Sequence, residues 1–130
     1  MPGEPILVVD DNPANLKLAW VLLTREGYEA RTAGGADEAL EAIRGFRPRL
    51  ILMDLQMPGM DGLELTRRLK ADPATGDIII VALTAHAMKG DEERVRAAGC
   101  DAYMSKPIDT RSLPALVARL LAEHPGGGAR

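Results

Sequence analysis

The chain has 130 residues, 46% of them hydrophobic and 27% charged, which is enough for one globular domain that folds without metal or disulfides. A net charge of −3 without a basic block argues against a direct nucleic-acid partner. The single cysteine, Cys100, excludes an internal disulfide and a thiolate metal cluster. No apolar run reaches the roughly 18 residues that predict a membrane span, so we expect a cytoplasmic protein without a membrane partner.

Apolar runs and amphipathic stretches alternate along the chain. Each of five short runs is followed by apolar residues at helical spacing, and this order predicts an α/β fold with a parallel sheet covered by helices on both faces. Residues 1–124 are expected to form this domain, and residues 125–130 a disordered tail. The predicted strands cover residues 5–9, 28–33, 51–54, 78–83 and 101–105.

Capping residues and glycines mark the expected ends of the helices. Asn12 followed by Pro13 predicts the start of the first helix. Gly27 and Gly99 are expected just after the ends of the first and fourth helices, where a left-handed residue is common. The second helix is expected to end at Gly45.

Two helices carry further expectations. The apolar stripe of the first helix is predicted to consist of Leu16, Ala19, Trp20 and Leu23. In the fifth helix Pro114 removes a backbone hydrogen bond. Either Asp109 is therefore not the cap and the helix starts later, or its first turn is irregular.

Polar side chains stand where four of the predicted strands end. Asp10 and Asp11 follow the first strand, Asp54 ends the third, and Thr84 and Lys106 follow the fourth and fifth. In an open parallel sheet the carboxyl ends of the strands meet at one edge, where ligands bind. Carboxylates gathered there repel one another, and oxygen ligands with open positions suit Mg²⁺. Carboxylate, divalent cation, ammonium and hydroxyl together predict a phosphoryl-transfer site, with a carboxylate as the nucleophile.

Each of these residues also has an ordinary interpretation when it is taken alone. Asp10 or Asp11 suits a helix cap, Thr84 a turn, and Lys106 a solvated surface. These interpretations are nearly independent, so it is improbable that all of them hold at one sheet edge. Other sites are not indicated: there is no glycine-rich nucleotide loop, residues 54–61 lack the ligands of a calcium loop, and His86 and His124 lack zinc spacing.

The sequence resembles a response regulator receiver domain, the phosphoacceptor module of two-component signalling. The resemblance spans nearly the whole chain and rests on four motifs in order: VVDDN at 8–12, MDLQMPGMDG at 53–62, LTA at 83–85 and YMSKP at 103–107. It implies a flavodoxin-like (βα)5 doubly wound sheet with the strand order 2-1-3-4-5.

The resemblance also implies a role for each site residue. Asp54 would accept a phosphoryl group, and Lys106 would pair with it. Thr84 and Tyr103 would form a switch pair that rearranges on phosphorylation. Three further sets of residues follow from the same resemblance: Asp10, Asp11, Asp54 and the backbone carbonyl of Gln56 around Mg²⁺; Gln56 and His86 tuning the lifetime of the phosphorylated state; and a cis peptide bond between Lys106 and Pro107.

The implied partners are a histidine kinase or a histidine phosphotransfer protein, and a downstream effector protein. The effector would read the surface made by the fourth helix, fifth strand and fifth helix. We expect a monomer, with a phosphorylation-linked dimer left open, that catalyses only its own phosphorylation and dephosphorylation. The kinase side would lie near Pro13, Ala14, Leu16, Lys17 and Pro107.

Three alternatives remain open at this point. The chain could be a receiver domain excised from a hybrid kinase or another multidomain regulator. It could be a small phosphatase of the haloacid dehalogenase kind, although Gln56 stands where such an enzyme usually has its general acid. It could be a pseudo-receiver that only binds partners, although such a protein would be expected to lack the acids, the threonine or the lysine.

Overall fold

Five parallel strands form one sheet in the order β2-β1-β3-β4-β5, as the sequence predicts. The computed structural model describes residues 3–55, 62–84, 89–106 and 108–123. The strands are β1 (Pro5–Val9), β2 (Glu29–Ala33), β3 (Leu50–Asp54), β4 (Ile79–Thr84) and β5 (Ala102–Ser105). The helices are α1 (Pro13–Arg25), α2 (Ala36–Phe46), α3 (Gly62–Ala71), α4 (Lys89–Ala98) and α5 (Ser112–Glu123).

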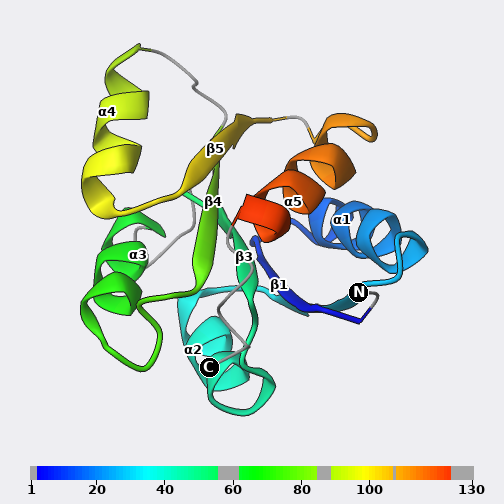
Figure 1. Cartoon of the computed structure of the whole chain (residues 1–130), viewed down its shortest axis with the longest axis horizontal. Helices are drawn as coiled ribbons and strands as arrows, with labels where there is room; N and C mark the ends of the chain where they lie inside the picture. Colours follow the sequence, from blue (N-terminus) through cyan, green and yellow to red (C-terminus); the bar gives the residue numbers. More distant parts are fainter. Residues whose placement is uncertain (1–2, 56–61, 85–88, 107, 124–130) are drawn as a thin grey trace.

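The helices cover the sheet in two layers, which Figure 1 shows on either side of the strands. Apolar residues of α1 and α5 pack on one face, and those of α2, α3 and α4 pack on the other. The central strands are therefore buried on both sides, which explains why their sequences are continuous apolar runs.

Successive side chains of β3 enter opposite layers. Leu50 and Leu52 pack with α1 and α5, whereas Ile51 and Met53 pack with α2, α3 and α4. Asp54 continues the Leu50–Leu52 row at the carboxyl end of the strand. The alternation thus directs its carboxylate toward the layer of α1 and α5.

The ends of α1 and α4 match their prediction. The Asn12 side chain accepts a hydrogen bond from the Ala14 N–H (2.9 Å) and caps α1. Gly27 and Gly99 have positive φ values of 93° and 105°. The prediction for α2 is wrong: its final turn includes Gly45 and runs to Phe46, and Arg47 adopts the left-handed conformation, with φ 53°. Gly45 thus stays in the helical conformation, and Arg47 adopts the left-handed conformation that a glycine would adopt with less strain.

The start of α5 follows the second of the two alternatives for Pro114, an irregular first turn with Asp109 as the cap. The Asp109 carboxylate accepts hydrogen bonds from the N–H groups of Arg111 and Ser112 (2.8 and 2.9 Å), so Asp109 caps the turn. Regular α-helix nevertheless begins only at Ser112, because Pro114 cannot donate to the turn before it.

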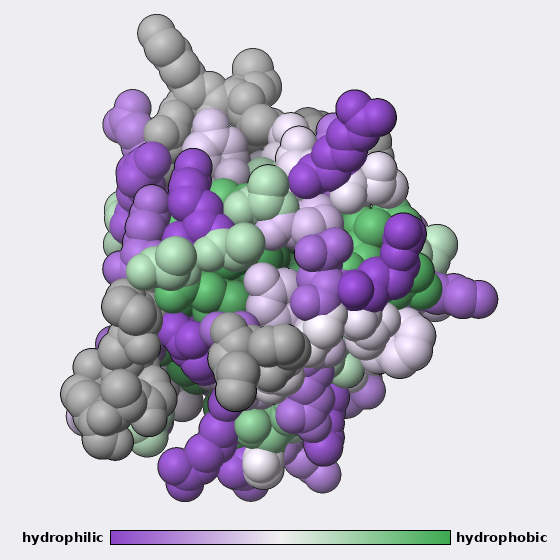
Figure 2. All heavy atoms as spheres, turned by 45° about the vertical axis from the view of Figure 1, so that its right-hand side comes forward, coloured by the Kyte–Doolittle hydropathy of each residue, from purple (hydrophilic) through white to green (hydrophobic). Residues whose placement is uncertain are grey.

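Trp20 does not belong to the core stripe of α1. The buried residues of this helix are Ala19, Leu22 and Leu23, while Trp20 is 45% exposed. It is the one exposed large hydrophobic side chain among the described residues. On the face drawn in Figure 2, hydrophilic side chains surround smaller apolar areas. No helix in the described ranges has the length and apolar character needed to cross a bilayer.

An ion pair ties helix to sheet at the amino-terminal edge of the strands. The Lys70 ammonium donates to the Ile78 carbonyl (2.8 Å) and to Asp101 Oδ2 (2.9 Å). The same carboxylate oxygen accepts the Ile80 N–H (2.8 Å). The end of α3, the start of β4 and the residue before β5 are thereby joined.

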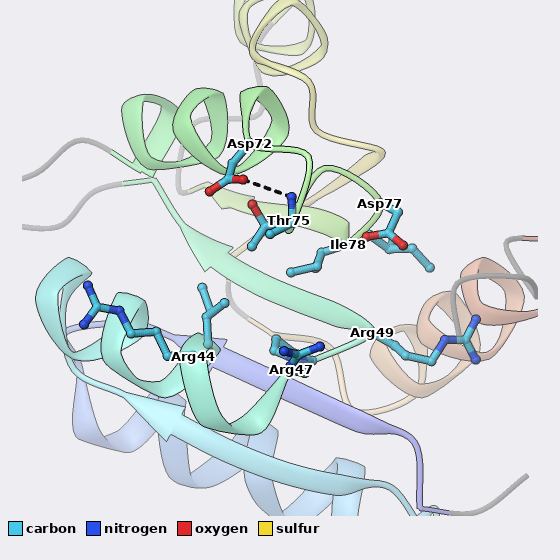
Figure 3. Close-up of a pocket in the computed structure, with 11 residues that line it drawn as sticks. Arg44, Arg47, Arg49, Asp72, Thr75, Asp77 and Ile78 are labelled. Atoms are coloured by element: carbon cyan, nitrogen blue, oxygen red, sulfur yellow. Dashed lines mark hydrogen bonds between the residues drawn. The ribbon is translucent and has the colours of Figure 1, made fainter. Parts of the chain in front are cut away.

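A hollow of about 540 Å³ opens at this same edge, between the α2–β3 and α3–β4 connections. Figure 3 shows Arg47 and Arg49 on one side of it, with Asp72 and Thr75 on the other. The Asp72 carboxylate beside the hollow is bonded within its own loop, because its Oδ1 accepts the Ala74 N–H (2.9 Å). The hollow lies at the end of the sheet opposite the residues predicted to do chemistry.

Candidate functional site

The predicted acidic residues meet at the carboxyl edge of the sheet. Strands β1 and β3 are neighbours, with Val9 opposite Met53, so the next residue of each strand, Asp10 and Asp54, is brought to the same place. Carboxylate oxygens of Asp10, Asp11 and Asp54 all lie within 4.8 Å of one another. Asp10 and Asp54 are fully buried and Asp11 is exposed, so two carboxylates of the cluster lie inside the protein and the third faces solvent.

Lys106 joins this cluster from the far side of β4. Its backbone N–H donates to the Thr84 carbonyl (2.7 Å), which extends the β4–β5 ladder by one bond. Its ammonium lies 3.0 Å from Asp54 Oδ1 and 3.3 Å from Asp10 Oδ2. Burial opposes the charge of the ammonium, but the bonds to both carboxylates prevail and raise the pKa of Lys106 above its usual value.

Asp10 is held by several donors besides the lysine. Its Oδ1 accepts the Asn12 N–H (2.9 Å), and its Oδ2 accepts the Asn15 side-chain amide (3.2 Å). Burial raises the pKa of Asp10, the Asn12 bond lowers it and the neighbouring Asp54 raises it again, so the pKa stands above the ordinary 3.8. The sequence analysis missed Asn15, whose signal was its position in the first turn of the helix that follows Asp10.

Thr84 and Tyr103 lie on the adjacent strands β4 and β5. Thr84 is 3% exposed at the end of β4, one residue beyond Leu83, which pairs with Asp54. Tyr103 pairs with Ala82 and is partly buried against the core beneath α2, α3 and α4. Thr84 therefore lies at the site edge and Tyr103 two residues before the end of β5, and their role as a switch pair stays a prediction.

Gly62 is a second residue that the sequence analysis did not single out. It begins α3, and a β-carbon built on it would overlap the Asp54 carbonyl oxygen and lie 2.9 Å from Leu55 Cα. The Gly62 carbonyl accepts the buried Thr66 hydroxyl (2.9 Å). Helix α3 therefore packs its first turn directly on the backbone that carries the Asp54 carboxylate, and only glycine fits there.

Several predicted features lie outside the described residues. These are the Gln56 carbonyl, His86, the bond between Lys106 and Pro107, and the tail at 125–130. They remain predictions.

The donor set fits Mg²⁺. Three carboxylates supply hard oxygen ligands, and one of them faces solvent, which suits an ion that keeps several waters. The described part of the site provides no cysteine or histidine for a softer metal. Three carboxylates and one ammonium leave an excess of negative charge that a divalent cation balances.

A doubly wound sheet with an acidic cluster, a lysine and a threonine at its carboxyl edge defines a receiver-type signalling domain. The model of the response regulator receiver domain family matches residues 6–118. The chain belongs to this family, whose members are signalling proteins.

Individual relatives agree with this assignment. The chain is 52% identical over 106 residues to the polar-differentiation response regulator DivK of Brucella anthropi, covering 81% of this chain and 85% of DivK. The structure of the chemotaxis protein CheY4 of Vibrio cholerae superposes with a TM-score of 0.87 at 26% identity, over 92% of this chain and 99% of CheY4.

A third relative bears on the metal. The receiver domain of the sensor histidine kinase PA1611 of Pseudomonas aeruginosa matches with a TM-score of 0.83 and 32% identity, over 92% of this chain and 98% of that domain. Its structure has a magnesium ion coordinated in the active-site cleft.

Proposed function

We propose that this receiver domain is a phosphorylation switch in which Asp54 accepts a phosphoryl group. The observation that carries the proposal is the pairing of fully buried Asp54 with the Lys106 ammonium at 3.0 Å, beside two further carboxylates. A buried carboxylate with a fixed cation and acidic neighbours has the composition of a phosphoryl-transfer centre.

Asp10, Asp11 and Asp54 are the described residues that would hold Mg²⁺, with the Gln56 carbonyl as a further ligand. When bound, the ion supplies positive charge that offsets the repulsion between the incoming phosphoryl oxygens and the carboxylates. Asp11 is the exposed member of the cluster, so it suits direct ligation from the solvent side.

Asp54 performs the covalent step. A carboxylate oxygen forms a bond to phosphorus while the bond from phosphorus to the imidazole nitrogen of a phosphohistidine breaks, and the electron pair of that bond returns to the imidazole. The product is an acyl phosphate. The Lys106 ammonium stays beside the new dianion, because it already lies within hydrogen-bond distance of Asp54.

Thr84 and Tyr103 convert this charge into a change of packing. The Thr84 hydroxyl donates to a phosphoryl oxygen, and the Tyr103 ring turns into the space that it leaves. The affected surface is α4, β5 and α5, which we propose as the site of an effector protein. Gln56 and His86 would set how long the phosphoryl group lasts.

The proposed phosphodonor is a histidine kinase or a histidine phosphotransfer protein that docks on α1. The surface near Pro13 and Lys17 lies beside Asp10 and Asp11 in the chain and therefore at the mouth of the site. By analogy with DivK we propose that the chain acts as a cytoplasmic single-domain regulator. A receiver domain that forms part of a larger kinase remains the second candidate.

Phosphorylation by a small-molecule donor tests the proposal. The protein is incubated with Mg²⁺ and acetyl phosphate, and its intact mass is measured. We expect one phosphoryl adduct on the wild type, none on Asp54→Asn, and one on the matched control Asp37→Asn, which changes an exposed acid in the first turn of α2.

Two results would contradict the proposed switch. One is the absence of an adduct on the wild type. The other is release of many equivalents of phosphate per protein, which is the behaviour of a phosphatase.

A further inference from the structure

The side chain of Asp10 is surrounded by donors of two kinds. Its Oδ2 accepts both the neutral Asn15 amide (3.2 Å) and the positively charged Lys106 ammonium (3.3 Å). Its Oδ1 accepts the backbone N–H of Asn12 (2.9 Å). Asp10 is fully buried, and a buried carboxylate is costly unless its oxygens are bonded.

The two side-chain donors respond differently to a cation. An ammonium and a divalent cation repel each other, so a cation entering the cluster weakens the contact between Lys106 and Asp10. The amide of Asn15 carries no net charge, and its bond to Asp10 is compatible with a cation on the other side of the carboxylate. Of the two, only Asn15 can therefore hold Asp10 both before and after the cation binds.

The position of Asn15 explains how it reaches Asp10. Asn12 caps α1 and Pro13 is the first helical residue, so Asn15 lies in the first turn. Helical side chains point back toward the amino terminus of the helix, which directs the Asn15 amide at the residues that precede α1. Asparagine is a weak helix former, so the helix itself gives no reason for this residue.

We propose that Asn15 is a positioning residue that fixes the Asp10 carboxylate for magnesium. The proposal rests on the proposed function only in taking the acidic cluster as the metal site. Partners that hydrogen-bond metal-ligating groups typically change metal affinity by about 10- to 100-fold when they are mutated. Asn15 is one of three donors to Asp10, so we expect the lower end of that range.

Magnesium binding to the unphosphorylated protein is the direct test. Titration calorimetry with MgCl2 is carried out on the wild type, on Asn15→Leu, and on Arg25→Leu as a matched control for an added leucine on an exposed position in the last turn of the same helix. We expect the dissociation constant to rise by about tenfold for Asn15→Leu and to stay within about twofold for Arg25→Leu.

A second variant and a second readout separate positioning from folding. Asn15→Ala removes the amide but favours the helix. Like Asn15→Leu, it should raise the dissociation constant for Mg²⁺, while the circular dichroism spectrum stays unchanged. The rate of labelling by acetyl phosphate should fall in both variants at limiting Mg²⁺ and recover at saturating Mg²⁺, because only the affinity is affected.

The outcomes distinguish this inference from the proposed function. If the wild type takes up a phosphoryl group and the folded Asn15 variants bind Mg²⁺ as tightly as the wild type does, the positioning role is wrong and the switch stands. If the wild type takes up no phosphoryl group while the Asn15 variants still bind Mg²⁺ about tenfold more weakly, the switch is wrong and the positioning role stands.

Discussion

Replacing Gly62 by alanine tests whether α3 packs on the backbone of the phosphoacceptor as closely as the structure indicates. The new β-carbon would lie 2.9 Å from Leu55 Cα and 3.2 Å from the Asp54 carbonyl carbon, and still closer to the carbonyl oxygen. All three neighbours are backbone atoms, which cannot turn away as a side chain can. Overpacking of this kind costs about 1–3 kcal/mol, and the helix gains back at most ~1 kcal/mol from losing a glycine.

Urea unfolding followed by circular dichroism measures the net change in the free energy of unfolding. We expect Gly62→Ala to lower the midpoint by roughly 0.5–1 M, and the yield of acetyl phosphate labelling to fall because the Asp54 backbone must shift. Gly45→Ala is the matched control, since Gly45 is also helical and a β-carbon there meets no atom within 4 Å. It should gain about 0.5–1 kcal/mol. A Gly62→Ala protein as stable as Gly45→Ala would refute the close approach.

Lys106→Met leaves Asp10 and Asp54 buried without their shared ammonium, and we expect it to lower the free energy of unfolding by about 3–5 kcal/mol in Mg²⁺-free buffer. Added Mg²⁺ should restore most of this loss, and identical urea curves with and without Mg²⁺ would contradict that expectation. The N–H groups of Ser112 and Arg111 lower the pKa of Asp109 below its usual 3.8, so its capping contribution is present above that pH and is lost as the pH falls through the lowered pKa. Thermal unfolding of Asp109→Ala and wild type should therefore differ at neutral pH and converge in acid, and a constant difference would exclude this role. Trp20, the only tryptophan, is exposed on α1, so a tryptophan-free phosphotransfer partner docking there should shift its emission to shorter wavelength, whereas binding without a shift would place the partner elsewhere.

The chain order and the site edge could be predicted because they depend on local patterns. Continuous apolar runs mark strands that are buried on both faces, and residues at the carboxyl ends of parallel strands must converge. The meeting of Asp10 and Asp54 follows from these two rules. That Lys106 reaches both carboxylates across β4 needs the three-dimensional distances.

The misses have specific physical causes. The expected end of α2 at Gly45 is one residue short, because Gly45 stays helical and Arg47 takes the left-handed position after Phe46. Trp20 was assigned to the core by hydrophobicity, although Ala19 and Leu23 fill the buried face of α1. Asn15 and Gly62 act through contacts with residues outside their own helices. Their positions at the starts of α1 and α3 indicate where such a contact can form, but not which residue it reaches.

The two ends of β5 are held by contacts of different kinds. Before the strand, Asp101 binds Lys70 and the Ile80 N–H at the edge remote from the acidic cluster. After it, Lys106 binds Asp10 and Asp54. The proposed phosphoryl group on Asp54 would add its charge directly beside the second contact, whereas the first contact lies at the opposite edge of the sheet. The proposed switch would therefore act on one end of β5 while the other end keeps its attachment to β4 and α3.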